Sequence, residues 1–336
     1  MAAVSVVAYH YSLFLHDDFG VERPRWLEIA GLRWLYPFQL GSYGVSLFFV
    51  ISGFVIFMTL RRTAHATDFA VSRFSRLYPA YWCGMLITSA FRVWLGGESL
   101  GTSTLLANAT MVPGWLGYPS IDGVYWTLVV ELQFYAIMLF IYLIKMLSCI
   151  EWVCLGWLGL LAVVQVSTRI GPLRAASELV ASVLILRHIP LFSAGMMFYR
   201  IFEDRLTRLR AAVIGLGYAA TWLSGNISKT IVVTLALLVM GLLVAGHLRL
   251  GAGRIWRWLG DCSYGIYLVH MTVGLIVMQK LATVSHSRLV LVVAPTLLTL
   301  GLAWAINRLV EKPALRSIRG WYDAHKSRRS LAKELT

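Results

Sequence analysis

Apolar stretches close to the length of a membrane-crossing helix recur along nearly the whole of this 336-residue chain. A helix needs about 20 mostly apolar residues to cross a bilayer. Inside lipid the backbone has no water to bond, so such stretches must be helical. With 58% apolar and only 14% charged residues, the composition disfavours a soluble domain. We therefore predict an all-α polytopic membrane protein, a single bundle of about ten transmembrane helices.

The predicted helices follow the apolar runs, and we expect a separate surface helix over 175–187, because Pro190 suits the first turn of the next helix. We expect one membrane domain over residues 1–315 and a basic cytoplasmic tail over 316–336. The predicted spans cover roughly residues 1–16, 40–60, 77–95, 124–147, 152–168, 188–203, 211–225, 229–247, 263–284 and 289–310.

Basic residues account for the net charge of +14, and they cluster at alternate ends of the apolar runs. This alternation is the pattern that the positive-inside rule gives to cytoplasmic loops, and it predicts that both termini are cytoplasmic. Because no basic patch with interleaved aromatics stands apart from the membrane, we expect no nucleic-acid partner. The clusters are Arg61, Arg62, Arg73 and Arg76; Arg200, Arg205, Arg208 and Arg210; Arg249, Arg254 and Arg257; and eight residues from Arg308 to Lys333.

Few polar groups fall inside the predicted spans, and an ionisable residue in a membrane is by default a candidate functional group. His10 lies on the first span and Glu131 on the fourth, at similar predicted depth. Tyr135 lies one turn from Glu131 on the same face. A histidine oriented by a carboxylate is suited to activating a hydroxyl. Structural hydrogen bonds between helices remain the alternative for each of these residues.

On the ninth span, His270 shares a face with Tyr264 and Tyr267 at three-residue spacing, and a structural role is the simpler interpretation. The second span, "GSYGVSLFFVISGFVIF", carries Ser52 and Gly53 among several small residues that favour close helix packing. The four cysteines show no metal-binding spacing, so we expect no metal site.

Arg73 and Arg76 stand one helical turn apart in "SRFSRLYPAYW", just before an apolar run. Guanidinium groups bind phosphate oxygens through two hydrogen bonds, and this spacing places both arginines on one helix face. A nucleotide-bearing acyl carrier such as coenzyme A would suit them. The alternative is a pair of membrane anchors that contact lipid phosphates.

Taken together, these segments resemble the acyltransferase-3 family of integral membrane O-acyltransferases. The resemblance covers nearly the whole chain and rests on seven segments in order. They are a histidine late in the first span (His10), "YGVSLFFVISGF", "SRFSRLYPAYW", "WTLVVELQFY", "FSAGMMFYR", "GDCSYGIYLVH" and "VEKPA" at 310–314.

The resemblance implies a ten-helix enzyme of the bacterial inner membrane that transfers an acyl group, often acetyl, from cytoplasmic acyl-CoA to a hydroxyl of a cell-surface or lipid-linked glycan. It implies no permanently bound cofactor; its expected partners are membrane lipids, acyl-CoA, the glycan and other proteins of polysaccharide biosynthesis. By the same resemblance His10 is the base, Glu131 is an acidic residue of the site, and Arg73 and Arg76 hold the donor. The expected structural or site-lining residues are Ser52, Gly53, Trp126, Tyr135, Tyr267 and His270.

The sequence leaves several points open. The family pattern carries an arginine about eleven residues before the first histidine, a position that precedes Met1 here, and the first span is short; both favour a start further upstream. The arginine pair and His10 are expected at opposite ends of their spans, so a path between helices must connect them. Direct transfer is preferred over an acyl-enzyme on Ser52. A glycolipid or anion transporter and an inactive scaffold of an envelope-polymer complex remain as alternatives.

Overall fold

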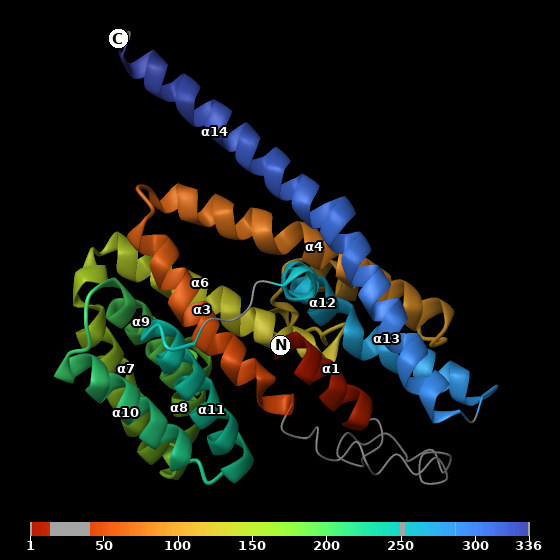
Figure 1. Ribbon diagram of the computed structural model, residues 1–336, viewed down its shortest axis with the longest axis horizontal. Coiled ribbons are helices and arrows are strands. Elements are labelled where there is room, and N and C mark those ends of the chain that lie inside the picture. Colours follow the sequence, from red (N-terminus) through yellow and green to blue (C-terminus); the bar gives the residue numbers. More distant parts are fainter. Residues whose placement is uncertain (1, 14–40, 249–252, 286, 335–336) are drawn as a thin grey trace.

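The computed structural model describes residues 2–13, 41–248, 253–285 and 287–334, and in these residues all regular structure is helical. The predicted all-α class is therefore confirmed for the described part of the chain (Figure 1). The longer helices are α1 (Ala2–Leu13), α3 (Gly44–Arg61), α4 (Ala66–Trp94), α5 (Thr102–Ala109), α6 (Trp126–Leu143), α7 (Ile150–Ser167), α8 (Arg174–Val183), α9 (Ile189–Glu203), α10 (Arg208–Trp222), α11 (Ile227–Val244), α12 (Arg254–Ala282), α13 (Arg288–Ala305) and α14 (Lys312–Glu334).

Six helical segments within the described residues are long and apolar enough to cross a membrane, which makes the chain a membrane protein. The predicted count of about ten spans is not confirmed. At 1.5 Å per residue, the 12 residues of α1 and the 15 residues of α9 and of α10 extend only about 18–23 Å, short of the ~30 Å hydrocarbon core. The six segments are Gly41–Arg61, Gly123–Leu143, Met146–Ser167, Ile227–Val244, Arg254–Ala282 and Leu289–Arg328.

The helices form two neighbouring groups joined by α3 and α6 (Figure 1). One group contains α7 to α11, in which α9 packs against both α3 and α10. In the other group α12 packs against α13, α4 and α1. Because α3 and α6 contact each other and α4 contacts α6 and α12, the residues expected at the active site come from helices that adjoin one another.

The seam between α3 and α9 depends on two glycines. A methyl group placed on Gly53 would lie 2.2 Å from the carbonyl oxygen of Phe192, and one on Gly195 would lie 2.0 Å from that of Val50. No ordinary side chain fits at such a distance, so the two backbones pass in direct contact, as small residues permit in membrane helices. Gly53 is therefore a packing residue.

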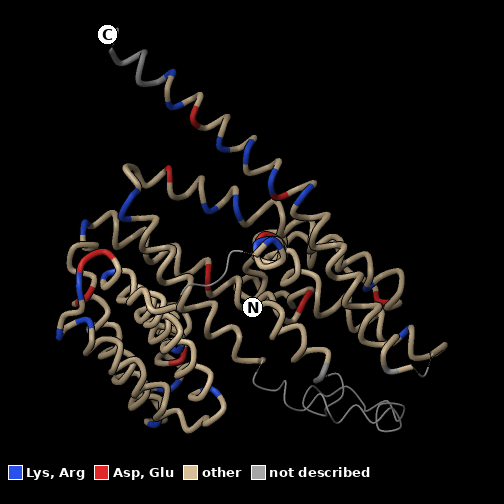
Figure 2. Tube along the Cα trace, viewed as in Figure 1, with Lys and Arg blue, Asp and Glu red and all other residues tan. Residues whose placement is uncertain are grey.

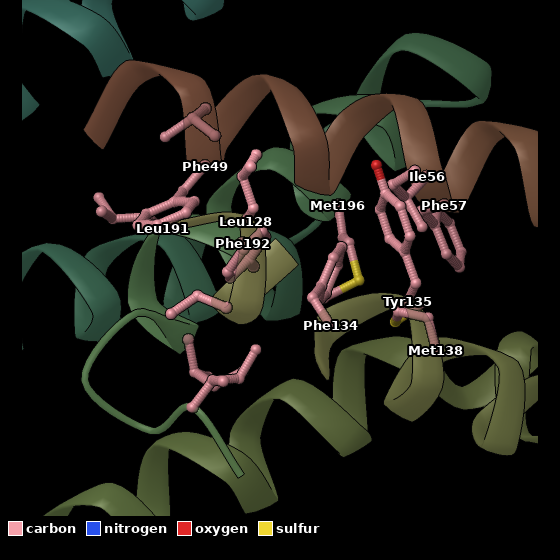
Figure 3. Packing of buried hydrophobic residues seen from close by; sticks show 14 of the residues in the cluster. Phe49, Ile56, Phe57, Leu128, Phe134, Tyr135, Met138, Leu191, Phe192 and Met196 are labelled. Atoms are coloured by element: carbon pink, nitrogen blue, oxygen red, sulfur yellow. The ribbon is translucent and has the colours of Figure 1, made fainter. Parts of the chain in front are cut away.

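Aromatic side chains fill the core between α3, α6 and α9 (Figure 3). The rings of Phe134 and Phe192 stack with centroids 3.9 Å apart, and Phe49 lies 4.9 Å from Phe192. Tyr135 lies at one end of this cluster with its hydroxyl toward α3, near Ile56 (Figure 3). The core thus holds the face of α6 that carries Tyr135 against α3.

The separate helix expected over 175–187 is present as α8, and Pro190 lies in the first turn of α9 as expected. Between the two helices the chain turns at Ile185, whose φ is +48°.

At the other end of the chain, α13 continues through a π-helical segment, η7 (Ile306–Glu311), directly into α14. Residues 289–328 therefore form one helix that crosses position 316, where the sequence predicts the start of a cytoplasmic tail. The first part of α14 packs along α4, and its far end projects from the bundle (Figure 1).

Candidate active site

A cavity of about 370 Å³ lies where α1, α3, α4, α6 and α12 meet. We call it the central cavity, and its volume falls in the range of small-molecule sites. Most of its lining is apolar, and the polar side chains are few and grouped. Those polar residues are Ser52, Arg73, Arg76, Thr127, Glu131, Tyr135, Ser263, Tyr264 and Tyr267.

The central cavity has two chemically different ends. At one end the Arg73 guanidinium lies 5.8 Å from the ring centroid of Tyr135. At the other, Thr127 and Tyr267 are joined by a short hydrogen bond between their hydroxyl groups. Thr127 and Tyr135 are eight residues apart on α6, which separates the two ends by about 12 Å. The arginine end and the hydroxyl end are therefore connected through one space.

Glu131 lies between these ends with only 5% of its surface exposed. Its Oε1 accepts hydrogen bonds from the hydroxyl of Tyr135 and, over 3.4 Å, from that of Ser52. The positive charges of Arg73 and Arg76 act on the same carboxylate. A buried carboxylate requires such compensation, so Glu131, Tyr135 and Arg73 form one electrostatic unit.

The two arginines of the "SRFSR" segment differ in their surroundings. Arg73 lies over the rings of Phe69 and Tyr135, with the guanidinium carbon 5.7 Å from the first centroid. Arg76 forms an ion pair in which Nη1 lies 2.7 Å from Oε1 of Glu311. Only 1% of the Glu311 side chain is exposed, and Asn307 also donates to it. Arg76 is thus neutralised by η7.

His10 pairs with His270 rather than with Glu131. Nδ1 of His10 lies 2.9 Å from Nε2 of His270, while Nδ1 of His270 lies 2.8 Å from the carbonyl oxygen of Tyr267. A carbonyl only accepts, so we assign the proton of His270 to Nδ1 and leave its Nε2 as an acceptor. Nδ1 of His10 must then be the donor, which leaves Nε2 of His10 without a proton in the neutral pair.

The structure brings most of the predicted site residues together. Ser52, Arg73, Arg76, Glu131, Tyr135 and Tyr267 all line the central cavity. The ring of His270 lies next to that of Tyr267, and the ring of His10 lies next to that of His270. The ring centroids are 5.6 Å apart for Tyr267 and His270 and 5.1 Å apart for the two histidines.

Two expected lining residues lie elsewhere, and His270 is not among the lining residues either. Gly53 is in the α3–α9 seam. Trp126 is 47% exposed and borders a separate hollow of about 350 Å³ with Trp115, Gln133 and His188. A helical period places residues on a face but does not say which neighbouring helix that face meets.

Sequence reasoning missed Glu311 and the structural role of Asp122, which it treats only as a residue of the 96–123 loop suited to bonding sugar hydroxyls. Asp122 precedes α6 and is fully buried; burial raises its pKa to about 6. Its Oδ1 accepts from the backbone N–H of Val124 and its Oδ2 from that of Thr272, two residues after His270. An acidic residue just before an apolar run is a capping signal, but nothing in the sequence shows its bond to α12.

None of the described residues forms a cluster of three or more His, Cys, Asp or Glu side chains suited to a metal ion. The described residues instead bring together two guanidinium groups at one end of the cavity, hydroxyl groups at the other, and a pair of imidazoles next to Tyr267. Imidazole is the side chain that most often serves as a general base.

A family model described as an acyltransferase domain matches residues 1–308. The chain therefore belongs to the acyltransferase-3 family and is a membrane acyltransferase. It is similar to nodulation protein 10 of Rhizobium leguminosarum bv. viciae, with 25% identity over 335 residues that cover 84% of each chain.

Two shorter matches point the same way. Exopolysaccharide production protein ExoZ of Rhizobium meliloti (strain 1021) is 32% identical over 111 residues, which are 30% of this chain and 34% of ExoZ. Acyltransferase MdmB of Streptomyces mycarofaciens is 32% identical over 115 residues, which are 32% of this chain and 30% of MdmB. No solved structure matches the chain.

Proposed function

We propose that the protein transfers an acyl group, acetyl in the first instance, from acyl-CoA to a hydroxyl of a cell-surface or lipid-linked glycan. The observation that carries this proposal is the central cavity, which joins the arginine end to Glu131 and to the hydroxyl end beside the histidine pair. The family membership supplies the reaction class.

The donor enters at the arginine end. Its phosphates are held there by guanidinium groups, whose planar forks match phosphate oxygens. The pantetheine arm extends along the apolar walls that α1 and α3 contribute to the cavity and passes Glu131. Glu131 and Tyr135 keep Arg73 oriented at this end, and the Glu131–Ser52 hydrogen bond holds the Ser52 hydroxyl beside the arm.

His10 acts as the general base through Nε2, the atom that the hydrogen bond to His270 leaves unprotonated. It takes the proton of the acceptor hydroxyl as the oxygen attacks the thioester carbonyl. The new C–O bond forms, the C–S bond breaks, and the departing thiolate takes the proton from the His10 imidazolium. Transfer is direct, and no acyl-enzyme on Ser52 is required.

The relatives support a glycan acceptor. One bears the name of an exopolysaccharide production protein and another that of a nodulation protein. We place the enzyme in a bacterial inner membrane with both termini in the cytoplasm, where acyl-CoA is available.

The test is CoA release from acetyl-CoA by purified protein in lipid, with a glycan extract as acceptor. We expect His10→Ala to lower the rate by about 100-fold or more, the usual contribution of a general base. The exposed His247 provides the control, His247→Ala, which should leave the rate unchanged. If several acyl donors and glycan extracts give no CoA release, the proposed transfer from acyl-CoA is contradicted. Flux assays with glycolipids and anions would then test the transporter alternative.

The orientation has its own test in Cys149, a free and exposed cysteine between α6 and α7. In intact cells a membrane-impermeant maleimide should leave Cys149 unlabelled, and it should label Cys149 in inverted membrane vesicles. Cys149→Ser should abolish that labelling. Labelling of Cys149 in intact cells would contradict the proposed orientation.

A further inference from the structure

Two arginines from distant parts of the chain converge on one serine hydroxyl. Nη2 of Arg73 lies 3.3 Å from Oγ of Ser72, and Nη2 of Arg319 lies 2.8 Å from the same atom. Arg73 and Ser72 belong to α4, whereas Arg319 belongs to α14. Two positive groups that share one neutral acceptor repel each other, so this contact alone does not explain why both are held there.

Each of these arginines also has an unsatisfied donor. In the part of the chain that the structure describes, Nε of Arg73 and Nε of Arg319 are buried and have no hydrogen-bond partner. A buried donor without an acceptor costs free energy, and it is uncommon unless a ligand or water satisfies it. Arg76 differs because Glu311 already pairs with it.

The charge of Arg73 is partly balanced by Glu131. Arg319, in contrast, forms no ion pair with any of the described side chains, and its side chain donates instead to the neutral Ser72 hydroxyl. The Arg73–Arg319 pair therefore has more positive charge than its described neighbours neutralise. An anion between the two guanidinium groups would supply both the missing charge and the missing acceptors.

Contacts on both sides of Arg319 hold it in this place. Before it, Glu311 of η7 is paired with Arg76 of α4. After it, the Tyr322 hydroxyl donates to Asp68 over 2.8 Å, and Nζ of Lys326 lies 2.8 Å from the same carboxylate. Figure 2 shows Lys and Arg spaced along α14 and along the first half of α4, where the two helices approach each other.

We propose that Arg73, Arg319 and Ser72 bind one phosphate group at the arginine end of the central cavity. The two guanidinium forks donate to its oxygens from both sides, and the Ser72 hydroxyl turns to donate to a third. The phosphate-binding pair is then Arg73 with Arg319, while Arg76 fastens α4 to η7. The phosphate belongs either to the acyl-CoA donor, in which case the inference rests on the proposed function, or to a phospholipid headgroup.

The experiment measures CoA binding by calorimetry with the full chain in nanodiscs of phosphatidylcholine. Arg319→Gln should raise the Kd for CoA by about tenfold or more, as expected for lost charge-assisted hydrogen bonds. Binding of pantetheine, which lacks phosphate, should not change. The matched control is Arg316→Gln, which removes an equal charge from an exposed position one turn earlier on α14.

Two further variants separate phosphate binding from a loss of helix docking. Arg319→Lys keeps the positive charge but lacks the planar guanidinium group that donates two parallel hydrogen bonds. It should give a Kd between those of wild type and Arg319→Gln. Ser72→Ala should weaken CoA binding, while the contacts of Tyr322 and Lys326 with Asp68 keep α14 docked on α4. The lipid source is examined by native mass spectrometry of wild type and Arg319→Gln in discs that contain phosphatidylglycerol.

The outcomes distinguish this inference from the proposed function. A Kd for CoA that rises with Arg319→Gln but not with Arg316→Gln supports a donor phosphate. If wild type binds no CoA but retains phosphatidylglycerol through Arg319, the phosphate site stands and the acyl-CoA donor fails. If wild type binds CoA, and Arg319→Gln matches Arg316→Gln for both CoA and lipid, the proposed site is overturned while the acyltransferase proposal stands.

Discussion

Arg76 of α4 and Glu311 of η7 form an ion pair 2.7 Å long, in which the carboxylate is buried and the guanidinium is 43% exposed. The pair joins two helical segments that are far apart in the sequence. It also compensates the negative charge of the buried Glu311 carboxylate, which would be costly without an ionic partner.

The first prediction concerns this pair. Arg76→Gln leaves the Glu311 carboxylate buried without an ionic partner and should destabilise the protein by about 1–3 kcal/mol. Because both residues act through one contact, the double variant Arg76→Gln/Glu311→Gln should lose less than the sum of the single losses. Unfolding in detergent, followed for all four proteins of the cycle, measures this coupling. Additive losses would show that the two residues act independently.

The second prediction concerns His270. Because His270 accepts the hydrogen bond from Nδ1 of His10, His270→Ala removes the contact that fixes the protonation of the base. We expect kcat to fall by about tenfold or more, less than for a lost base, with the KM for the donor unchanged.

A conservative variant separates positioning from general damage to the fold. The side-chain oxygen of His270→Gln accepts a hydrogen bond as Nε2 does, so this variant should recover part of kcat. An equal loss for His270→Ala and His270→Gln would argue against a positioning role.

The third prediction concerns the glycine seam. Gly53→Ala places a methyl group 2.2 Å from the carbonyl oxygen of Phe192, so α3 and α9 must separate. Overpacking of this kind should lower the free energy of unfolding by about 1–3 kcal/mol. In contrast, Gly156→Ala on α7 meets no atom within 4 Å and should be neutral or mildly stabilising. Unfolding midpoints in detergent compare the two variants.

The fourth prediction concerns the pH dependence of α14 docking. The hydrogen bond from Lys326 holds the pKa of Asp68 below its usual range. A carboxyl with a lowered folded-state pKa adds stability above its unfolded pKa and loses it as pH falls through the folded value. Docking of α14 should therefore be complete at neutral pH and weaken below about pH 4, the usual range of aspartate.

Hydrogen exchange of the backbone over 312–328, corrected for the intrinsic rate at each pH, measures this docking. Asp68→Asn should reduce the protection already at neutral pH and remove most of its dependence on pH. Equal protection of the wild type at pH 7 and below about pH 4 would contradict the role of Asp68.

The sequence predicts local relationships well and relationships between helices poorly. Glu131 and Tyr135 are one turn apart, and the structure joins them by a hydrogen bond as that spacing implies. The partner of His10 was not predicted. Similar predicted depth permits a contact with Glu131, but the structure pairs His10 with His270, because the rotation of each helix decides which side chains meet. The contacts of Glu311 and Arg319 with α4 are not predicted from the sequence, because each joins residues more than 230 positions apart along the chain.

The predicted count of about ten spans is not confirmed, because six helical segments of the described residues are long and apolar enough to cross a membrane. Apolar runs identify buried helices as readily as membrane-crossing ones. The helix α9 is apolar and mostly buried, and its 15 residues are fewer than the ~20 that a crossing helix needs. A helix enclosed by other helices reads like a span in the sequence. Length and burial separate the two cases only when the fold is known.

The contact between α3 and α9 has a consequence for the range of donors that the enzyme accepts. Two backbones already in contact leave α3 no room to retreat, so this wall of the central cavity is rigid. Under the proposed function, the space left for the donor then depends on the side chains that α3 contributes to the cavity lining, such as Phe48, Ile51 and Val55. We expect a bulkier donor to be accommodated by shortening these side chains rather than by separating the helices.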